Sequence, residues 1–186
     1  MITIRFDPFE DRLARDIRNA LSETIIDVFE QMNIGPAQKA ADGFLHKELG
    51  PIYDQYIAQR LEAYAQGLEI IRAEQLALLW DKALVLWDLG LFFEVHEMLE
   101  YGWLKATGTE KLVLQAMIRA AGMYIKLHDQ DNARGAAKMA SKAVEVLEAN
   151  RHFFSADFPL NLLLDKLHRL DPVPPKLRTA GWKLSQ

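Results

Sequence analysis

Ionisable and large apolar side chains are mixed over one short stretch of the chain, LGLFFEVHEMLEYGW, which covers residues 89–103. A helix turns by about 100° per residue, so the imidazole of His96 and the carboxylate of Glu100 would lie one turn apart on one face. Five apolar residues share that face, which we therefore expect to be buried: Phe92, Phe93, Leu99, Trp103 and Leu104. Glu97 falls at its margin, and Glu94, Met98, Tyr101 and Gly102 fall on the opposite side. Because burying an unpaired ionisable group is costly, His96 and Glu100 need each other, a cation or a ligand as partner.

One chemistry that this spacing offers is metal binding. His96 and Glu100 are four residues apart, as are paired ligands on one helix, and Glu97 between them would be the general base of a metal-dependent hydrolase. A third ligand must come from elsewhere in the chain. The histidines that would supply it are His46, His128, His152 and His168, of which His128 is the candidate we retain. On an ideal helix, however, His128 points away from Gln115 and Arg119.

A second interpretation is structural, and it is the one we favour. Gln115 and Arg119 lie on the following helix, where they would close a buried network of hydrogen bonds and ion pairs with His96 and Glu100. Such a network would specify packing and would perform no reaction. The sequence leaves open whether Arg119 faces His96 or belongs, with its neighbours Lys111 and Lys126, to a solvated edge.

The third interpretation is the binding of a small anionic ligand. Arg119, Lys126 and His96 would hold a carboxylate or phosphate, with the guanidinium supplying a two-pronged contact. The walls of that cleft would be aromatic: Phe92, Phe93, Trp103 and Tyr124. The sequence contains no Gly-rich phosphate loop and no nucleophile elbow, so it does not decide whether the protein is an enzyme. We expect a binding or scaffolding module, with no cofactor unless the metal interpretation holds.

The segments that would position these residues are helical. Apolar residues recur at intervals of three or four along most of the chain, which predicts an all-α protein, a bundle of antiparallel helical hairpins. Asp7 and Pro8 favour a helix start, and Gly90 favours a left-handed helix end. The helices are expected over residues 8–31, 37–49, 51–89 with a break near 73–75, 91–105, 109–128, 132–149 and 160–170. Residues 1–6 alternate in polarity and predict an extended arm on the bundle.

Three regions follow from this pattern. Residues 1–75 form an N-terminal helical extension, residues 76–170 form the domain with the His-Glu stretch, and residues 171–186 form a Pro-containing tail. The tail carries Trp182, whose ring is expected either to dock or to serve as a contact. Alanines line one side of the helix expected over residues 132–149. Such small side chains let the backbone of a neighbouring helix come close, either within the same chain or in a dimer. The aromatic stretch 53–87 is equally open to either use.

Composition limits the cellular setting. The 186 residues carry a net charge of −4, which argues against a nucleic-acid partner. No cysteine is present, so disulfides and thiolate metal sites are excluded. No apolar run approaches the roughly 18 residues of a membrane span, and the N-terminus does not resemble a signal peptide. We therefore expect a cytoplasmic protein with no membrane partner. Its binding partner is unknown, and a homodimer stays open.

A resemblance to a known family covers residues 83–147. His96, Glu97, Glu100 and Trp103 match the His-Glu-x-x-Glu-x-x-Trp helix of the family called domain of unknown function 309, and the preceding aromatic pair fits as well. Further on, Gln115 meets the first position of the family's Gln-Gly-x-x-Gln helix, where Ala116 and Arg119 replace the Gly and the second Gln. Asn132, Gly135 and Ala136 match its Asn-x-x-Gly-Ala turn. The resemblance implies a small helical domain and brings no activity with it.

Overall fold

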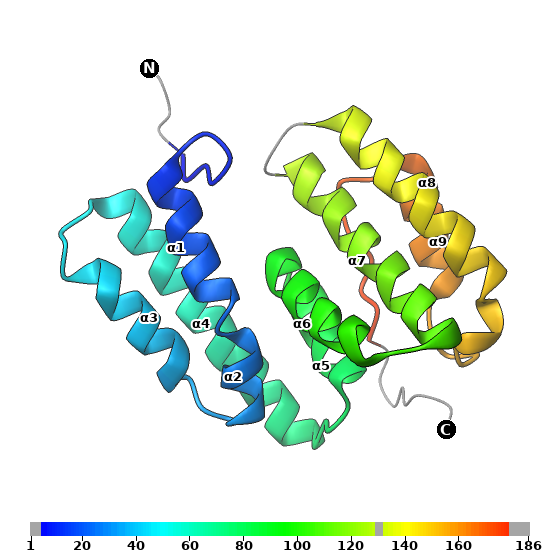
Figure 1. The fold of residues 1–186 in the computed structure, drawn as a ribbon, viewed down its shortest axis with the longest axis horizontal. Coiled ribbons are helices and arrows are strands. Elements are labelled where there is room, and N and C mark those ends of the chain that lie inside the picture. Colours follow the sequence, from blue (N-terminus) through cyan, green and yellow to red (C-terminus); the bar gives the residue numbers. More distant parts are fainter. Residues whose placement is uncertain (1–4, 129–131, 179–186) are drawn as a thin grey trace. The chain divides into compact units, whose positions relative to one another are not determined.

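The computed structural model describes residues 5–128 and 132–178, and in these residues all regular structure is helical (Figure 1). The chain divides into two compact units, Met1–Leu76 and Ala77–Gln186. The predicted all-α class is therefore confirmed.

The first unit consists of α1 (Arg12–Ser22), α2 (Ile25–Glu30), α3 (Gly35–Leu45) and α4 (Pro51–Glu74). A single helix was predicted to run through residues 8–31, and this prediction is wrong. The hydroxyl of Thr24 donates to the carbonyl oxygen of Leu21 at 2.7 Å, and the Thr24 N–H bonds to the same oxygen at 3.0 Å. A threonine side chain thus competes for a backbone carbonyl, and the helix is interrupted there. The small core of this unit contains Ile17, Leu21, Ala41 and Ile57.

Two aspartates organise the start of the first unit. The carboxylate of Asp7 accepts the N–H of Phe9 at 3.0 Å, as expected of a helix cap. Residues 8–10, however, form only a single turn, and α1 begins after it. Asp11 caps α1 by accepting the N–H of Leu13 at 2.9 Å. Of the predicted arm, residues 1–4 lie outside the described residues, and the ring of Phe6 stacks on Tyr56.

The break that the sequence predicted near residues 73–75 is confirmed. Helix α4 ends at Glu74, and Gln75 has a φ of 55°, the left-handed conformation that closes many helices. The chain then enters the second unit.

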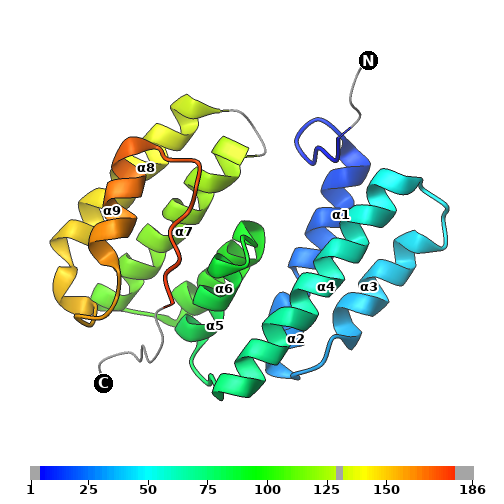
Figure 2. The ribbon, with the colours of Figure 1, turned by 180° about the vertical axis from the view of Figure 1, so that it is seen from behind.

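The second unit holds the family-like stretch. Its elements are α5 (Leu79–Asp88), α6 (Phe92–Lys105), α7 (Gly108–His128), α8 (Ala133–Ala149), the short 3-10 helix η1 (Arg151–Phe153) and α9 (Leu160–Arg169). Gly90, with a φ of 73°, ends α5 as predicted, because the Leu91 N–H reaches the carbonyl oxygen of Leu86 at 2.9 Å. Helix α7 lies between α6 and α8 (Figures 1 and 2).

Helices α7 and α8 approach closely through small residues. Ala136, Ala140 and Ala143 of α8 are buried, which confirms the packing use of its alanines. On α7, a Cβ added to Gly122 would lie only 2.6 Å from the sulfur of Met139. A side chain at position 122 would therefore require Met139 to move.

The Pro-containing tail is part of the second unit. Residues 171–178 are extended and pack on α5, as the red segment in Figure 2 shows. The indole N–H of Trp87 donates to the carbonyl oxygen of Pro175 at 2.9 Å. The carboxylate of Asp88 accepts the N–H groups of Leu177 at 2.8 Å and Arg178 at 3.2 Å, and Lys176 donates to the Asp88 carbonyl. Trp182 lies outside the described residues.

Within the described part of the chain, every helix is too short or too polar to pass through a lipid bilayer.

Candidate functional site

Helix α6 buries a different face from the one its sequence predicts. Glu94 was expected to be exposed, yet it is 0 % exposed, beside the buried Val95 and Met98. The side chains of His96 and Glu100 were expected to be buried, yet they are 39 % and 49 % exposed. Both predictions are wrong. The reason is that α6 has neighbours on two sides, α5 and α7, so its apolar residues are spread around the helix and do not mark one face.

His96 and Glu100 form a surface pair. Nδ1 of His96 lies 3.7 Å from Oε2 of Glu100, one helical turn apart. Water screens a pair of this exposure, so it contributes on the order of 0–1 kcal/mol to stability.

The buried network that we favoured from the sequence is not formed. Gln115 and Arg119 are both half-buried on α7. Within the described ranges, neither side chain forms a hydrogen bond or an ion pair with His96 or Glu100. His96 and Glu100 pair with each other, and Arg119 forms no hydrogen bond or ion pair with another described residue.

The family-motif residues nevertheless lie along one side of the α6–α7 hairpin. The ammonium of Lys111 lies 4.4 Å from the ring centre of Trp103, so these two side chains lie on the same side of the α6–α7 hairpin. On α7, Gln115 and Arg119 follow Lys111 at intervals of four residues. On α6, Glu100 lies three residues before Trp103, and His96 lies four residues before Glu100. The residues of each helix therefore form a row, and the two rows run along the same side of the hairpin. We call this set the motif face: His96, Glu100, Trp103, Lys111, Gln115 and Arg119.

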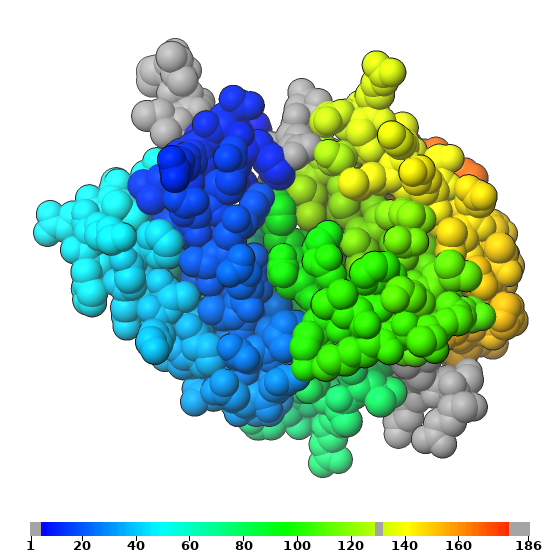
Figure 3. Space-filling model, viewed as in Figure 1, coloured from blue at the N-terminus to red at the C-terminus, as the bar shows by residue number. Residues whose placement is uncertain are grey.

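Helix α8 borders the motif face on the far side of α7. Met139 covers Gly122, and the stem of Lys126 on α7 touches the position of a Cβ on Gly135. Figure 3 shows side chains of α6 in green, α7 in yellow-green and α8 in yellow reaching one surface of this unit. Three helices therefore contribute to this surface.

The metal ligands proposed from the sequence are not brought together. In residues 5–128 and 132–178, no three His, Asp or Glu side chains are grouped so that they would hold a metal ion. Nε2 of His128 lies 2.6 Å from the carbonyl oxygen of Pro172, and its ring packs against Phe92 and Tyr124. His46, His152 and His168 are exposed on other elements.

The aromatic cleft expected around an anion is only partly present. Phe92 and Tyr124 belong to the core, where their rings stack at 5.0 Å, and Trp87 meets Tyr124 edge to face at 5.5 Å. Burial raises the pKa of the Tyr124 phenol well above its usual value, and its hydroxyl has no hydrogen-bond partner among the described residues. Only Phe93 and Trp103 of the predicted walls are partly exposed.

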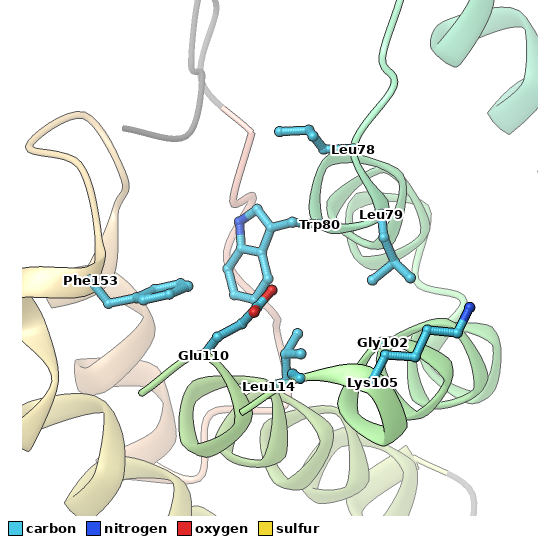
Figure 4. A pocket seen from close by; sticks show the side chains of 9 residues that line it. Leu78, Leu79, Trp80, Gly102, Lys105, Glu110, Leu114 and Phe153 are labelled. Carbon is cyan, nitrogen blue, oxygen red and sulfur yellow. The ribbon is translucent and has the colours of Figure 1, made fainter. Parts of the chain in front are cut away.

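Sequence reasoning missed a pocket in the second unit. Its volume is about 350 Å³, and its walls come from α5, α6, α7 and η1 (Figure 4). Nine residues line it: Leu78, Leu79, Trp80, Gly102, Lys105, Ala106, Glu110, Leu114 and Phe153. The one sequence signal for this pocket was the group of phenylalanines in a loop, Phe153, Phe154 and Phe158, all of which pack against the ring of Trp80.

Comparison with known proteins supports the resemblance drawn from the His-Glu helix. Residues 80–139, which run from α5 into α8, match the model of the family described as a domain of unknown function (DUF309). No curated protein and no solved structure matches the chain. The second unit thus contains a DUF309-like helical segment, and the motif face lies within it.

Proposed function

We propose that the second unit is a binding module and that its motif face holds an anionic group of the ligand, a carboxylate or a phosphate. The main support for this proposal is that the guanidinium of Arg119 has no partner among the described residues. Its side chain is half-buried on α7 and forms no hydrogen bond or ion pair with another described residue. A guanidinium in such a position keeps all its donors for a planar anion, which it contacts in a two-pronged way.

The neighbours of Arg119 fit this role. Lys111 adds a second cation two turns away, and the ring of Trp103 beneath its ammonium holds that charge in place. Gln115, between the two cations, offers an amide donor. The carboxylate of Glu100 lies beside the imidazole of His96, with Oε2 3.7 Å from Nδ1.

The alternative of a metal-dependent hydrolase has less support. Its two ligands, His96 and Glu100, have the right spacing, but no third ligand reaches them from the described residues. An anion site needs no such group, because Arg119 and Lys111 already supply the charge.

The test is a titration of the full-length protein with inorganic phosphate and with succinate, followed by amide chemical shifts. We expect saturable shifts at residues of the motif face. Replacing Arg119 by Gln, the residue of the family pattern, removes the guanidinium and lowers the affinity by about tenfold or more, since a charge-assisted hydrogen bond contributes roughly 1.5–3 kcal/mol.

The matched control is Arg169→Gln. Arg169 lies on α9 and is already paired with Asp165 at 2.9 Å, so its loss removes the same charge outside the motif face. The proposal is wrong if neither anion binds, or if the two variants weaken binding equally.

A further inference from the structure

The pocket beside Trp80 is separate from the motif face and differs from it in chemistry. Six of its nine lining residues are Leu, Ala, Trp or Phe, and Gly102 leaves part of one wall without a side chain. Its volume of about 350 Å³ is at the lower end of small-molecule sites, which span roughly 300–1,000 Å³.

One polar atom in this apolar wall has no partner. Trp80 is 5 % exposed, and its indole nitrogen has no hydrogen-bond acceptor among the described residues. Leaving a buried N–H unsatisfied costs free energy, and buried indole N–H groups usually find an acceptor. Trp87, which is also buried, does so through Pro175. An acceptor supplied by a ligand would satisfy Trp80 in the same way.

One of the residues that line the pocket, Leu78, has a side chain that can move. Leu78 precedes α5, lines the pocket and is 51 % exposed, so little packing holds it in place. Figure 4 shows the indole between Phe153 on one side and Leu79 and Leu114 on the other, with Leu78 above it. A shift of Leu78 is the least costly way for an acceptor atom to reach the indole N–H.

The charges at the pocket do not favour an ionic ligand of either sign. Lys105 and Glu110 are both exposed, and Figure 4 shows them on opposite sides of Leu114. Opposite charges at the two sides give no net preference for either sign of ligand charge. Burying a charge against apolar walls would moreover cost free energy that neither group recovers.

We propose that this pocket binds a small neutral molecule that joins an apolar chain or ring to one carbonyl oxygen. The apolar part packs against Leu79, Leu114 and Phe153, and the carbonyl oxygen accepts the hydrogen bond that the Trp80 N–H donates. Amides, esters and ketones of medium chain length have this chemistry.

The test uses the full-length protein and three probes with the same chain: octanamide, octanoate and octylammonium. Calorimetry or ligand-observed NMR gives their affinities. We expect octanamide to bind most tightly. Trp80→Phe keeps a ring and removes the N–H, so it lowers the affinity for octanamide by about tenfold, which corresponds to one hydrogen bond. It changes the affinity for octylammonium less, because that probe has no hydrogen-bond acceptor.

A second variant tests the pocket without touching Trp80. A Cβ on Gly102 would lie 3.0 Å from Cδ2 of Leu79, so Gly102→Ala narrows the pocket and displaces the end of a flexible side chain. The substitution suits a helix interior, so the fold is retained, and we expect octanamide binding to weaken severalfold. Gly43→Ala is the matched control, because a Cβ there meets nothing within 4 Å, and it lies on α3 of the first unit.

Three results overturn the proposal. The first is the absence of saturable octanamide binding, and the second is tighter binding of either charged probe. The third is unchanged octanamide affinity in Gly102→Ala and in folded Trp80→Phe. If Trp80→Phe does not fold, Gly102→Ala decides alone. None of these results bears on anion binding at Arg119, which is measured with different ligands.

Discussion

Trp87 donates its indole N–H to the carbonyl oxygen of Pro175 at 2.9 Å, although 88 positions separate the two residues. This bond ties residues 171–178 to α5, where Asp88 accepts two further N–H groups from the same segment. The tail is thereby a structural part of the second unit.

The first prediction concerns this bond. Trp87→Phe leaves the buried carbonyl of Pro175 without its donor, and we expect a loss of stability of about 1–3 kcal/mol beyond the loss of ring volume. Trp80→Phe is the matched control, because it removes an indole N–H that has no acceptor among the described residues. Chemical denaturation measures both. Equal losses in the two variants would show that the Trp87 bond contributes nothing.

The second prediction is a pH dependence from Asp88. Burial raises the pKa of this carboxyl above its usual value, against the opposing effect of the Leu177 and Arg178 N–H groups. A raised pKa in the folded state means that the folded protein binds the proton more tightly. The contribution of Asp88 to stability is therefore complete below the unfolded-state pKa and is lost as the pH rises through the folded-state pKa.

The measurement compares the wild type with Asp88→Asn, which cannot titrate. The free energy of unfolding of the wild type, relative to that of the variant, should fall as the pH rises from the acid range towards neutrality. A difference that is flat with pH, or that rises, would contradict the prediction.

The third prediction concerns the contact between α7 and α8. Gly122→Ala places a Cβ 2.6 Å from the sulfur of Met139, so Met139 must move, and we expect a loss of about 1–3 kcal/mol from overpacking. Met139→Ala in the same chain should recover part of that loss, which a double-mutant cycle detects as coupling. Additive effects of the two substitutions would contradict the contact.

The fourth prediction follows from the correction to α6. His96→Ala removes one member of an exposed pair and should cost less than about 1 kcal/mol. Glu94→Ala removes a carboxylate that is 0 % exposed, and we expect it to cost several times more, because its interaction partner is left without it. Thermal unfolding of both variants checks the order. If His96→Ala lost more stability than Glu94→Ala, the result would contradict this prediction and support the burial of His96 expected from the sequence.

The fifth prediction concerns the first unit. The Tyr53 hydroxyl donates to Oδ2 of Asp11 at 2.6 Å, and this bond is the main reason why the pKa of Asp11 is lowered. With a lowered pKa, the stabilising contribution is present above the unfolded-state pKa and is lost as the pH falls through the folded-state pKa. Tyr53→Phe should raise the pKa of Asp11 and shrink this acid-sensitive contribution. NMR titration of the Asp11 carboxyl measures this pKa in both proteins, and an unchanged pKa in Tyr53→Phe would refute the prediction.

Local chemistry made several features predictable. The end of α4 near residues 73–75, the left-handed glycine after α5 and the buried alanines of α8 all follow from short-range rules of helix termination and close packing. The interruption after α1 was missed because the Thr24 hydroxyl competes with the backbone only in one local geometry, which periodicity does not reveal. The sequence placed the residues of the candidate site on two successive helices, α6 and α7, and its prediction that His96 and Glu100 are buried is wrong.

By itself, the sequence determined the helical class, most helix ends and the family-like stretch around His96, because these depend on residues a few positions apart. Only the tertiary structure decided which face of α6 is buried, since two neighbouring helices cover it and apolar residues occur around its circumference. It also decided that the tail docks on Trp87 and Asp88, because backbone carbonyl and N–H groups make most of those bonds and every residue type except proline carries both. The pocket at Trp80 likewise arises where four elements meet, and no single segment encodes such a meeting.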